Sequence, residues 1–481
     1  MTFASRFRPV YQTRGSEIAR PMHRNVRDFA RQVRQRARSG DLAGALEMIS
    51  ELVVMVIVRD ASLAEVFASA ELDELCVELG RQPGIRSPTT PDADVSMFLV
   101  TSLPRSGGHT RVLLDLIRSD AAPRQLILVT NVLGDQQLED LDLLFGEESA
   151  KIELAPNTNL EGRLRWLQDR LHEFCPARTY VLQHHFDPLC IAAAQPELCG
   201  QLIYIHNCDH SLALGVHAPN AIHVDYTAKA FHNCRDRHGL QSNVFWPLTA
   251  DVPDHRRDRP FLVHCALTTC TCGGFEKFET PHLIQNIPYL FSYPEAVHLI
   301  LQSTGGRHIH IGHLSDNMLD AIAGELAGAG ISRDCFVSIP FVPSLPAALL
   351  EHQVDVYVGS FPRGGGRACV EAMGAGMPMI IHSNYRSIFF SDEAEVYPQA
   401  LTWRTPEELA SHLKSLSADV LRDHAGMSRS HYERYHRPEL LREAVAGTLA
   451  GRLPAVPARP NYRPDALQHF LDRLADGLDL V

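Results

Sequence analysis

A glycine-rich segment followed by a glutamate has residue types suited to binding a phosphorylated ligand. Residues 354–382 read VDVYVGSFPRGGGRACVEAMGAGMPMIIH, in which three consecutive glycines, Gly364, Gly365 and Gly366, separate an apolar strand pattern from a helical pattern that carries Glu371. Glycines before a helix allow backbone N–H groups to approach an anion, and the helix start adds positive potential. Glu371 could accept hydrogen bonds from ribose hydroxyls. The segment indicates a nucleotide-diphosphate site, whereas the glycines alone would also fit a tight turn.

A second group of candidate residues lies in YIHNCDHSLALG, directly after an apolar run. It contains His206, Asp209 and His210. A histidine beside a carboxylate can accept a hydroxyl or amide proton near neutral pH, which suits a general base. The alternatives are packed histidines or a metal site built from the His-rich segment 184–223. We expect no metal, because no spacing there is as specific as H-E-x-x-H or paired C-x-x-C motifs.

Three further segments follow predicted strands. Gly107, Gly108 and His109 follow the first apolar run, where we expect the acceptor side of a site or a simple turn. Lys277 follows Thr268–Gly274, and its ammonium group could reach a diphosphate. His308 and His310 alternate with isoleucines and therefore share one face of a strand, either lining a site or packed in the core.

The surrounding pattern predicts how these segments are positioned. Residues 1–92 hold a basic arm and small helices, residues 93–252 alternate apolar strands with helices, and residues 258–450 repeat that alternation after a polar linker. Residues 451–481 are proline-rich and end in an amphipathic helix. In the repeat we expect a strand over 261–267, helices over 282–291 and 318–327, and a strand over 336–339. The fold class is α/β, with two doubly wound domains facing across a cleft and an N-terminal helical extension.

These motifs resemble those of bacterial GT-B-fold glycosyltransferases. The resemblance covers roughly residues 95–445, and its most specific part is EAMGAGMP at 371–378, similar to the group's E-A-x-A/G-x-G-x-P. It implies that Glu371 binds the donor ribose, that the glycine loop holds the diphosphate, and that Lys277 and Arg367 also contact the donor. Many retaining members carry a second glutamate eight residues before the first, where this chain has Arg363.

Arg363 bears on the mechanism and on the alternatives. A cation there cannot replace a carboxylate, although it could neutralise diphosphate, so we expect inverting displacement with His210 or His206 as base and Asp209 beside it. The expected donor is a UDP-sugar, used without a cofactor, for hexosyl or N-acetylhexosaminyl transfer. The acceptor could be a protein, a glycan or a lipid-linked molecule. A nucleotide-sugar 2-epimerase, a metal-dependent hydrolase and a non-enzymatic scaffold stay open as alternatives.

The composition of the chain limits the classes of binding partner that we expect. The 481-residue chain has a net charge of −12, but residues 1–40 contain ten arginines and two acidic residues, so this arm carries +8 and the remainder −20. We expect no nucleic-acid partner for the acidic body, and the arm could dock to a membrane surface or to a protein. Eleven dispersed cysteines, no signal-peptide pattern and no long apolar run favour a cytoplasmic protein.

Overall fold

The computed structural model describes residues 26–57, 64–84, 90–104, 108–134, 136, 145, 150–252, 257–262, 266–279, 292–384 and 387–460. The described residues form two compact units. The first unit contains the described residues up to 103, together with residues 121–224 and 240–242. The second unit contains residues 104–120 and 225–239 and the described residues from 243 onward. Two short segments from the N-terminal half of the sequence therefore belong to the second unit. Gly107 and the helix predicted over 282–291 lie outside the described residues, as does the amphipathic helix predicted at the end of residues 451–481.

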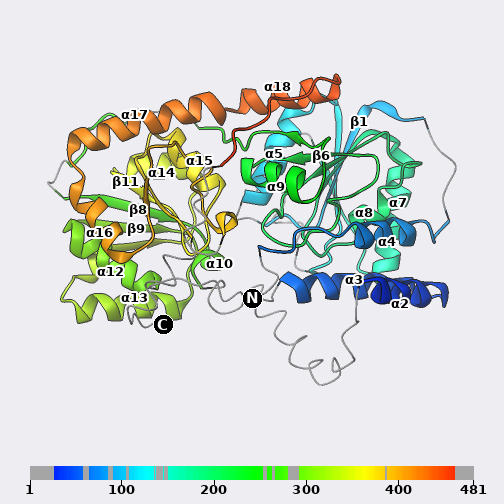
Figure 1. Ribbon diagram of the computed structural model, residues 1–481, viewed down its shortest axis with the longest axis horizontal. Helices are drawn as coiled ribbons and strands as arrows, with labels where there is room; N and C mark the ends of the chain where they lie inside the picture. The colour runs from blue at the N-terminus through cyan, green and yellow to red at the C-terminus, as the bar shows by residue number, and fades with distance from the viewer. Residues whose placement is uncertain are drawn as a thin grey trace. The chain divides into compact units, whose positions relative to one another are not determined.

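The first unit is built on a parallel sheet (Figure 1). Its strands lie in the order β3-β2-β1-β4-β5-β6. Central β1 pairs with β2 on one side and with β4 on the other, which is the order of a doubly wound sheet. The bounds are β1 Asp92–Val100, β2 Arg124–Val129, β3 Lys151–Leu154, β4 Pro176–Leu182, β5 Gln201–Ile205 and β6 Ala221–Asp225. Helices α7 (Leu160–Phe174) and α8 (Leu189–Ala193) also belong to this unit.

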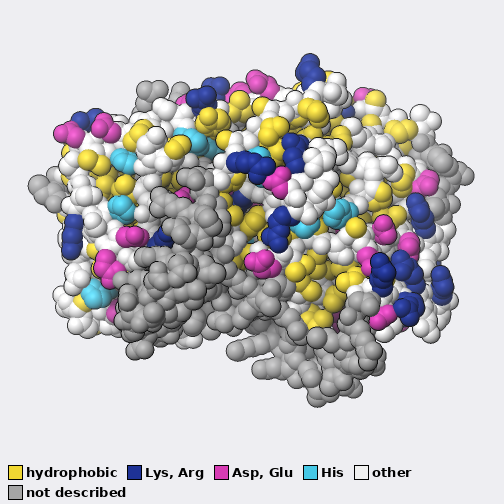
Figure 2. Space-filling model, viewed as in Figure 1, with side chains coloured by type: hydrophobic (Ala, Val, Ile, Leu, Met, Phe, Trp, Pro, Cys, Tyr) yellow, Lys and Arg dark blue, Asp and Glu magenta, His cyan; other side chains and the backbone are white. Residues whose placement is uncertain are grey.

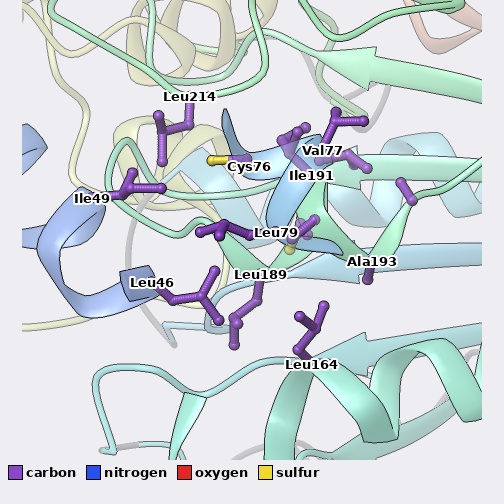
Figure 3. Close-up of a cluster of buried hydrophobic side chains, with 14 of the residues drawn as sticks. Leu46, Ile49, Cys76, Val77, Leu79, Leu164, Leu189, Ile191, Ala193 and Leu214 are labelled. Carbon is purple, nitrogen blue, oxygen red and sulfur yellow. The ribbon is translucent and has the colours of Figure 1, made fainter. Parts of the chain in front are cut away.

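Three N-terminal helices share the hydrophobic core of this first unit. They are α2 (Val26–Arg38), α3 (Leu42–Ile57) and α4 (Ala70–Gly80). Figure 3 shows Leu46 and Ile49 of α3 in one apolar cluster with Leu79 of α4 and with side chains from α7 and α8. A buried carboxylate adds a polar connection, because Asp73 of α4 accepts hydrogen bonds from the backbone N–H groups of Gly215 (2.6 Å) and His217 (2.8 Å). The helices are thus integral to the first core.

The second unit contains another parallel sheet, in the order β10-β9-β8-β11-β12-β13. Its strands are β8 Thr268–Cys272, β9 Arg307–Ile311, β10 Phe336–Ile339, β11 Val356–Val358, β12 Met379–His382 and β13 Leu401–Trp403. Its helices include α5 Gly108–Ser119, α9 Ala228–Arg237, α10 Phe275–Phe278, α12 Tyr293–Thr304, α13 Asp316–Gly328, α14 Leu345–Glu351, α15 Arg367–Gly374, α16 Pro406–Ser415, α17 Ala418–Tyr435 and α18 Pro438–Leu449. The short strand β7 (Val244–Phe245) also has its residues in this unit.

One predicted strand of the second half is displaced. We expected it over 261–267, but the strand β8 covers Thr268–Cys272, which we had read as the loop after it. The segment TTCTC is not a continuous aliphatic run, yet threonine favours strands and thiols pack as small apolar groups. Pairing with β9 and β11 places β8 in the middle of the sheet. The helix expected over 318–327 and the strand over 336–339 match α13 and β10 closely.

Among the described residues, no helix is both long enough and apolar enough to span a bilayer.

Candidate functional site

The glycine loop connects β11 to α15 in the second unit, as the sequence predicted. Gly366 begins α15 with φ of 54°, a left-handed conformation that favours glycine. The backbone N–H groups of all three glycines donate within the protein. Gly364 donates to the Phe390 carbonyl (2.8 Å), whereas Gly365 and Gly366 donate to the two carboxylate oxygens of Asp392 at 2.5 and 2.8 Å. The loop therefore binds an anionic group, which in this structure is a buried side chain.

Asp392 is fixed from several directions. It is buried, and it also accepts a hydrogen bond from the thiol of Cys369 (3.3 Å). Its neighbour Ser391 is held by the buried ammonium group of Lys229, which donates to the Ser391 carbonyl (2.9 Å) and contacts Glu395 at 3.3 Å. A methyl group added at Gly364 would lie only 2.4 Å from Asp392 Oδ1. The lack of a side chain at Gly364 is thus required by the approach of this carboxylate.

Glu371 is held by a buried arginine one helical turn before it. Arg367 Nε donates to Glu371 Oε1 at 3.1 Å, and the same guanidinium group bonds to Asp115 on α5 and to the Thr249 carbonyl (2.8 Å). Arg367 and Asp115 are about nine-tenths buried, whereas the Glu371 side chain keeps 22% of its surface exposed. Arg367 therefore orients Glu371 and leaves the carboxylate accessible.

Burial and charge have opposite effects on the pKa values of Arg367 and Asp115. Burial raises the pKa of the Asp115 carboxyl, and the guanidinium of Arg367 opposes that rise. Burial also acts to lower the pKa of Arg367, but the charges of Asp115 and Glu371 outweigh burial and raise it. Arg367 consequently stays protonated as the central cation of the group.

The predicted acceptor-side segment lies beside Arg367. Gly108 begins α5, and a methyl group added there would be 3.7 Å from Arg367 Cβ. His109 is the next residue of α5 and is partly buried. Since α5 also carries Asp115, this helix is positioned against the start of α15, on the side where we expected the donor.

Lys277 and Arg363 both lie next to the glycine loop. Lys277 Nζ donates to the Gly364 carbonyl, which ties α10 to the loop. The Arg363 carbonyl accepts a hydrogen bond from the Ser360 hydroxyl (3.0 Å), and its side chain is partly buried. The predicted donor-site residues of the second unit are therefore brought together by α10, α15 and the loop between β11 and α15.

A buried chain of hydrogen bonds fixes the carbonyl that precedes α10. It runs from the Thr269 hydroxyl to His308 Nδ1 (2.8 Å), from His308 Nε2 to the Tyr293 hydroxyl (3.1 Å), and on to His310 Nδ1 (2.7 Å). His310 Nε2 then reaches the Gly273 carbonyl at 3.0 Å. Burial lowers the pKa of His308 to about 3 and that of His310 to about 4, so both rings are neutral at pH 7. The sequence left open whether these histidines line a site or pack in the core, and the structure shows that they pack in the core.

The candidate bases lie in the first unit, just after β5. Asp209 Oδ1 is 4.0 Å from His210 Nδ1, and both side chains are partly buried. His206 is buried, with its ring centroid 5.2 Å from that of His223. The ring of His210 packs edge-on against His185 at 4.8 Å. The predicted His–Asp pair is adjacent, with His210 more exposed than His206.

Comparison with known proteins was made at the level of sequence and of structure. No protein-family model matches the chain, and no curated protein matches it by sequence. Solved structures do match. HepE of Anabaena, in complex with UDP-glucose, superposes with a TM-score of 0.56 at 13% identity, covering 74% of this chain and 99% of HepE. The protein has the GT-B fold.

Two other GT-B structures agree with this assignment. A glycosyltransferase of Rickettsia africae gives a TM-score of 0.54 at 10% identity, over 74% of this chain and 98% of its own. The lipopolysaccharide outer core galactosyltransferase WaaB gives 0.50 at 12% identity, over 74% and 99%. At identities this low, the structural matches establish the fold alone, which is a GT-B fold with two parallel-sheet α/β domains.

Sequence reasoning missed three residues around the glycine loop and Arg367: Asp392, Asp115 and Lys229. Asp392 lies in SDEAE and Lys229 in an ordinary helical pattern, so neither had a local signal. Asp115 did have one, because it interrupts the apolar run VLLDLI of α5. A carboxylate on a buried helical face needs a cationic partner, and that requirement could have directed attention to Arg367.

Proposed function

We propose that this protein is a glycosyltransferase that moves a sugar from a nucleotide-diphosphate donor, with UDP-sugar as the donor class. The observation that carries the proposal is the position of Glu371, a partly exposed carboxylate fixed by Arg367 on the helix that follows the glycine loop. The GT-B neighbour HepE was solved with UDP-glucose, which supports the same donor class here.

In this proposal the donor is bound by the second unit. Glu371 accepts hydrogen bonds from the ribose hydroxyls, and Lys277 and Arg363 contribute positive charge for the diphosphate. The N–H groups of the glycine loop already donate to Phe390 and Asp392, so we assign the loop no direct hydrogen bond to the diphosphate. Because Arg367 is engaged by Asp115, Glu371 and Thr249, we assign it a positioning role through Glu371 instead of direct diphosphate binding.

The proposed reaction is a single inverting displacement. An acceptor hydroxyl or amide forms a bond to the anomeric carbon as the bond from that carbon to the diphosphate breaks, and nucleotide diphosphate leaves with the electron pair. His210, with Asp209 beside it, takes the acceptor proton, and His206 is the second candidate base. The acceptor is a protein, a glycan or a lipid-linked molecule, and no resident cofactor takes part.

Thermal denaturation with UDP tests the donor assignment. UDP should raise the melting temperature of the wild type and raise that of Glu371→Ala much less, since ligand binding stabilises only the form that binds it. Glu351→Ala, on an exposed residue of α14, is the matched control and should keep the full shift. Equal shifts in wild type and Glu371→Ala would remove the ribose assignment.

A donor screen tests the reaction. Purified protein incubated with a panel of nucleotide sugars should hydrolyse one class of donor slowly in water, with loss of activity in Glu371→Ala. Mass spectrometry of cell extract after incubation should then show added hexose or N-acetylhexosamine. Conversion of the donor to its epimer without hydrolysis or transfer would instead establish an epimerase.

A further inference from the structure

A large concavity of the second unit lies at the C-terminal end of α15, the helix that carries Glu371. This arginine groove has a volume of about 1020 Å³ and is lined by Arg257, residues 259–261, the turn Gly374–Gly376 and part of α17. Arg257 locates it, because its guanidinium group donates to the Val354 carbonyl and pairs with Asp355, both just before β11. The glycine loop follows the other end of that strand. The groove therefore lies at the other end of β11 and α15 from the glycine loop.

Six arginines line the arginine groove: Arg257, Arg259, Arg422, Arg429, Arg434 and Arg437. Glu433 is the single acidic residue among the lining residues that the structure describes, and it is shared by Arg429 (2.5 Å) and Arg437 (3.7 Å). Arg259 and Arg434 are exposed and have no ion pair with a described carboxylate. Two further arginines are paired, Arg257 with Asp355 and Arg422 with Asp419, so the excess positive charge of the groove comes chiefly from Arg259 and Arg434.

The arginines are arranged along a line. Arg422 and Arg429 lie two turns apart on α17 and share one face with Ala425 and Gly426, whereas Arg434 lines the groove from a neighbouring face of the same helix. The twelve residue-to-residue steps from Arg422 to Arg434 span about 18 Å at 1.5 Å per residue. In Figure 1, α17 is the orange helix that crosses the second unit beside α15. A line of guanidinium groups of this length fits an elongated ligand with several anionic groups better than a single phosphate.

The floor of the arginine groove is made of small and apolar residues. Besides the arginines, Glu433 and Ser430 it is lined by Pro260, Phe261, Ala375, Ala425 and three glycines. Guanidinium groups bind carboxylate and sulfate in bidentate geometry, whereas a smooth apolar floor suits the C–H faces of sugar rings. We propose that this groove binds an anionic oligosaccharide, with its acid groups on the arginines and its rings on the floor.

Two other polyanions fit the lining less well. A linear polyphosphate has no apolar surface to cover the floor between the arginines. Single-stranded nucleic acid needs exposed aromatic rings for base stacking, and the lining residues include one, Phe261, whose face is covered by the Arg257 guanidinium at 4.1 Å. Figure 2 shows Lys and Arg side chains of the described residues beside Asp and Glu on the face it presents.

Calorimetric titration with a heparin octasaccharide tests the proposal. The wild type should bind it, and the triple variant Arg259→Gln/Arg434→Gln/Arg437→Gln should bind at least about tenfold more weakly, which equals ~1.4 kcal/mol. These three positions are exposed, and the variant leaves out Arg257 and Arg429, whose guanidinium groups hold backbone carbonyls. Binding should also weaken as salt rises from 50 to 300 mM, because the arginines are solvent-accessible.

Two control variants distinguish binding in the arginine groove from non-specific attraction between the oligosaccharide and arginines elsewhere on the surface. Arg31→Gln/Arg81→Gln/Arg165→Gln removes three exposed arginines of the first unit and should leave the affinity within about twofold. Gly426→Trp changes no charge and fills the groove, since nothing lies within 4 Å of a Cβ added there, and it should weaken binding like the groove triple.

Several results would overturn the proposal. They are no heparin binding by the wild type, an equal loss in the control triple, or unchanged affinity in Gly426→Trp. Tighter binding of a linear polyphosphate or a single-stranded oligonucleotide of equal charge would also overturn it, because the groove would then recognise charge without sugar. No donor is present in any titration, so the outcome is independent of the proposed transferase reaction.

Discussion

At the scale of single residues, Arg367 connects two carboxylates that lie far apart in the sequence. It orients Glu371 one turn along α15 and satisfies the buried Asp115 of α5. Removing one partner of a buried pair leaves an uncompensated charge, which is far more costly than replacing both partners by apolar residues. Stability and the proposed donor binding therefore depend on the same guanidinium group.

Arg367→Met should lower the free energy of unfolding by about 3–5 kcal/mol, because Asp115 loses its cation. Urea denaturation measures this, and Arg367→Met/Asp115→Leu should recover part of the loss. Arg442→Met is the control. Arg442 is exposed, and among the described residues its ion pair is with Glu439 on its own helix. A loss in Arg442→Met as large as that in Arg367→Met would contradict this account of the buried pair.

Gly364→Ala should destabilise the protein, because the new methyl group would lie 2.4 Å from Asp392 Oδ1 and displace the carboxylate that the loop binds. Gly324→Ala in α13 has open space around its Cβ and should instead stabilise by about 0.5–1 kcal/mol, as alanine favours a helix over glycine. Melting temperatures of the two variants should therefore shift in opposite directions. A rise in both would show that Asp392 can move away at little cost.

At the scale of elements, the chain Thr269–His308–Tyr293–His310–Gly273 connects β8, β9 and α12 to the loop before α10. Its direction follows from the tautomers: with His310 Nε2 donating to Gly273, Nδ1 must accept from Tyr293. Both rings must stay neutral to keep these roles. Protonation would therefore disturb the loop that positions Lys277.

This network should make stability depend on pH. The pKa values of His308 and His310 are lowered by burial to about 3 and about 4, below about 6.5 for an unfolded histidine. The unfolded chain binds more protons between pH 4 and 6.5, so stability is full above pH 6.5 and falls by about 1.4 kcal/mol per pH unit per histidine as pH decreases.

Urea denaturation at pH 7 and pH 5 measures this dependence. His310→Gln should show a smaller loss between the two pH values than the wild type, whereas His352→Gln, on a partly exposed residue, should match the wild type. Burial raises the pKa of Asp73 to about 7, which acts in the opposite direction, but this contribution is common to all three proteins and cancels. Identical pH dependence in His310→Gln and wild type would contradict the prediction.

At the scale of the whole molecule, the N-terminal helices are part of the first unit. Asp73→Ala should lower the free energy of unfolding by roughly 2–4 kcal/mol, because it leaves the N–H groups of Gly215 and His217 buried without an acceptor. Glu74→Ala, on the exposed face of the same helix, should change it by less than about 0.5 kcal/mol. Urea denaturation distinguishes the two, and equal small effects would mean that α4 docks independently of Asp73.

Sequence patterns predicted the elements better than their long-range partners. Apolar periodicity located β10 and α13, and the glycines marked the start of α15. The strand β8 was displaced because threonine and cysteine do not form an aliphatic run. The partners of the glycine loop and of Arg367 could not be predicted, since Asp392 and Asp115 meet them only through the tertiary fold.

The Arg367–Asp115 pair has a consequence for synthesis, because its members are 252 residues apart. At 5–20 residues per second, the ribosome needs roughly 13–50 s to deliver Arg367 after Asp115 has been made. During that interval the strands around β1 can already pair, while α5 presents a carboxylate on an apolar face with no cation to receive it. A nascent chain stalled before residue 367 should therefore keep α5 accessible to proteases, and release of the full chain should protect it.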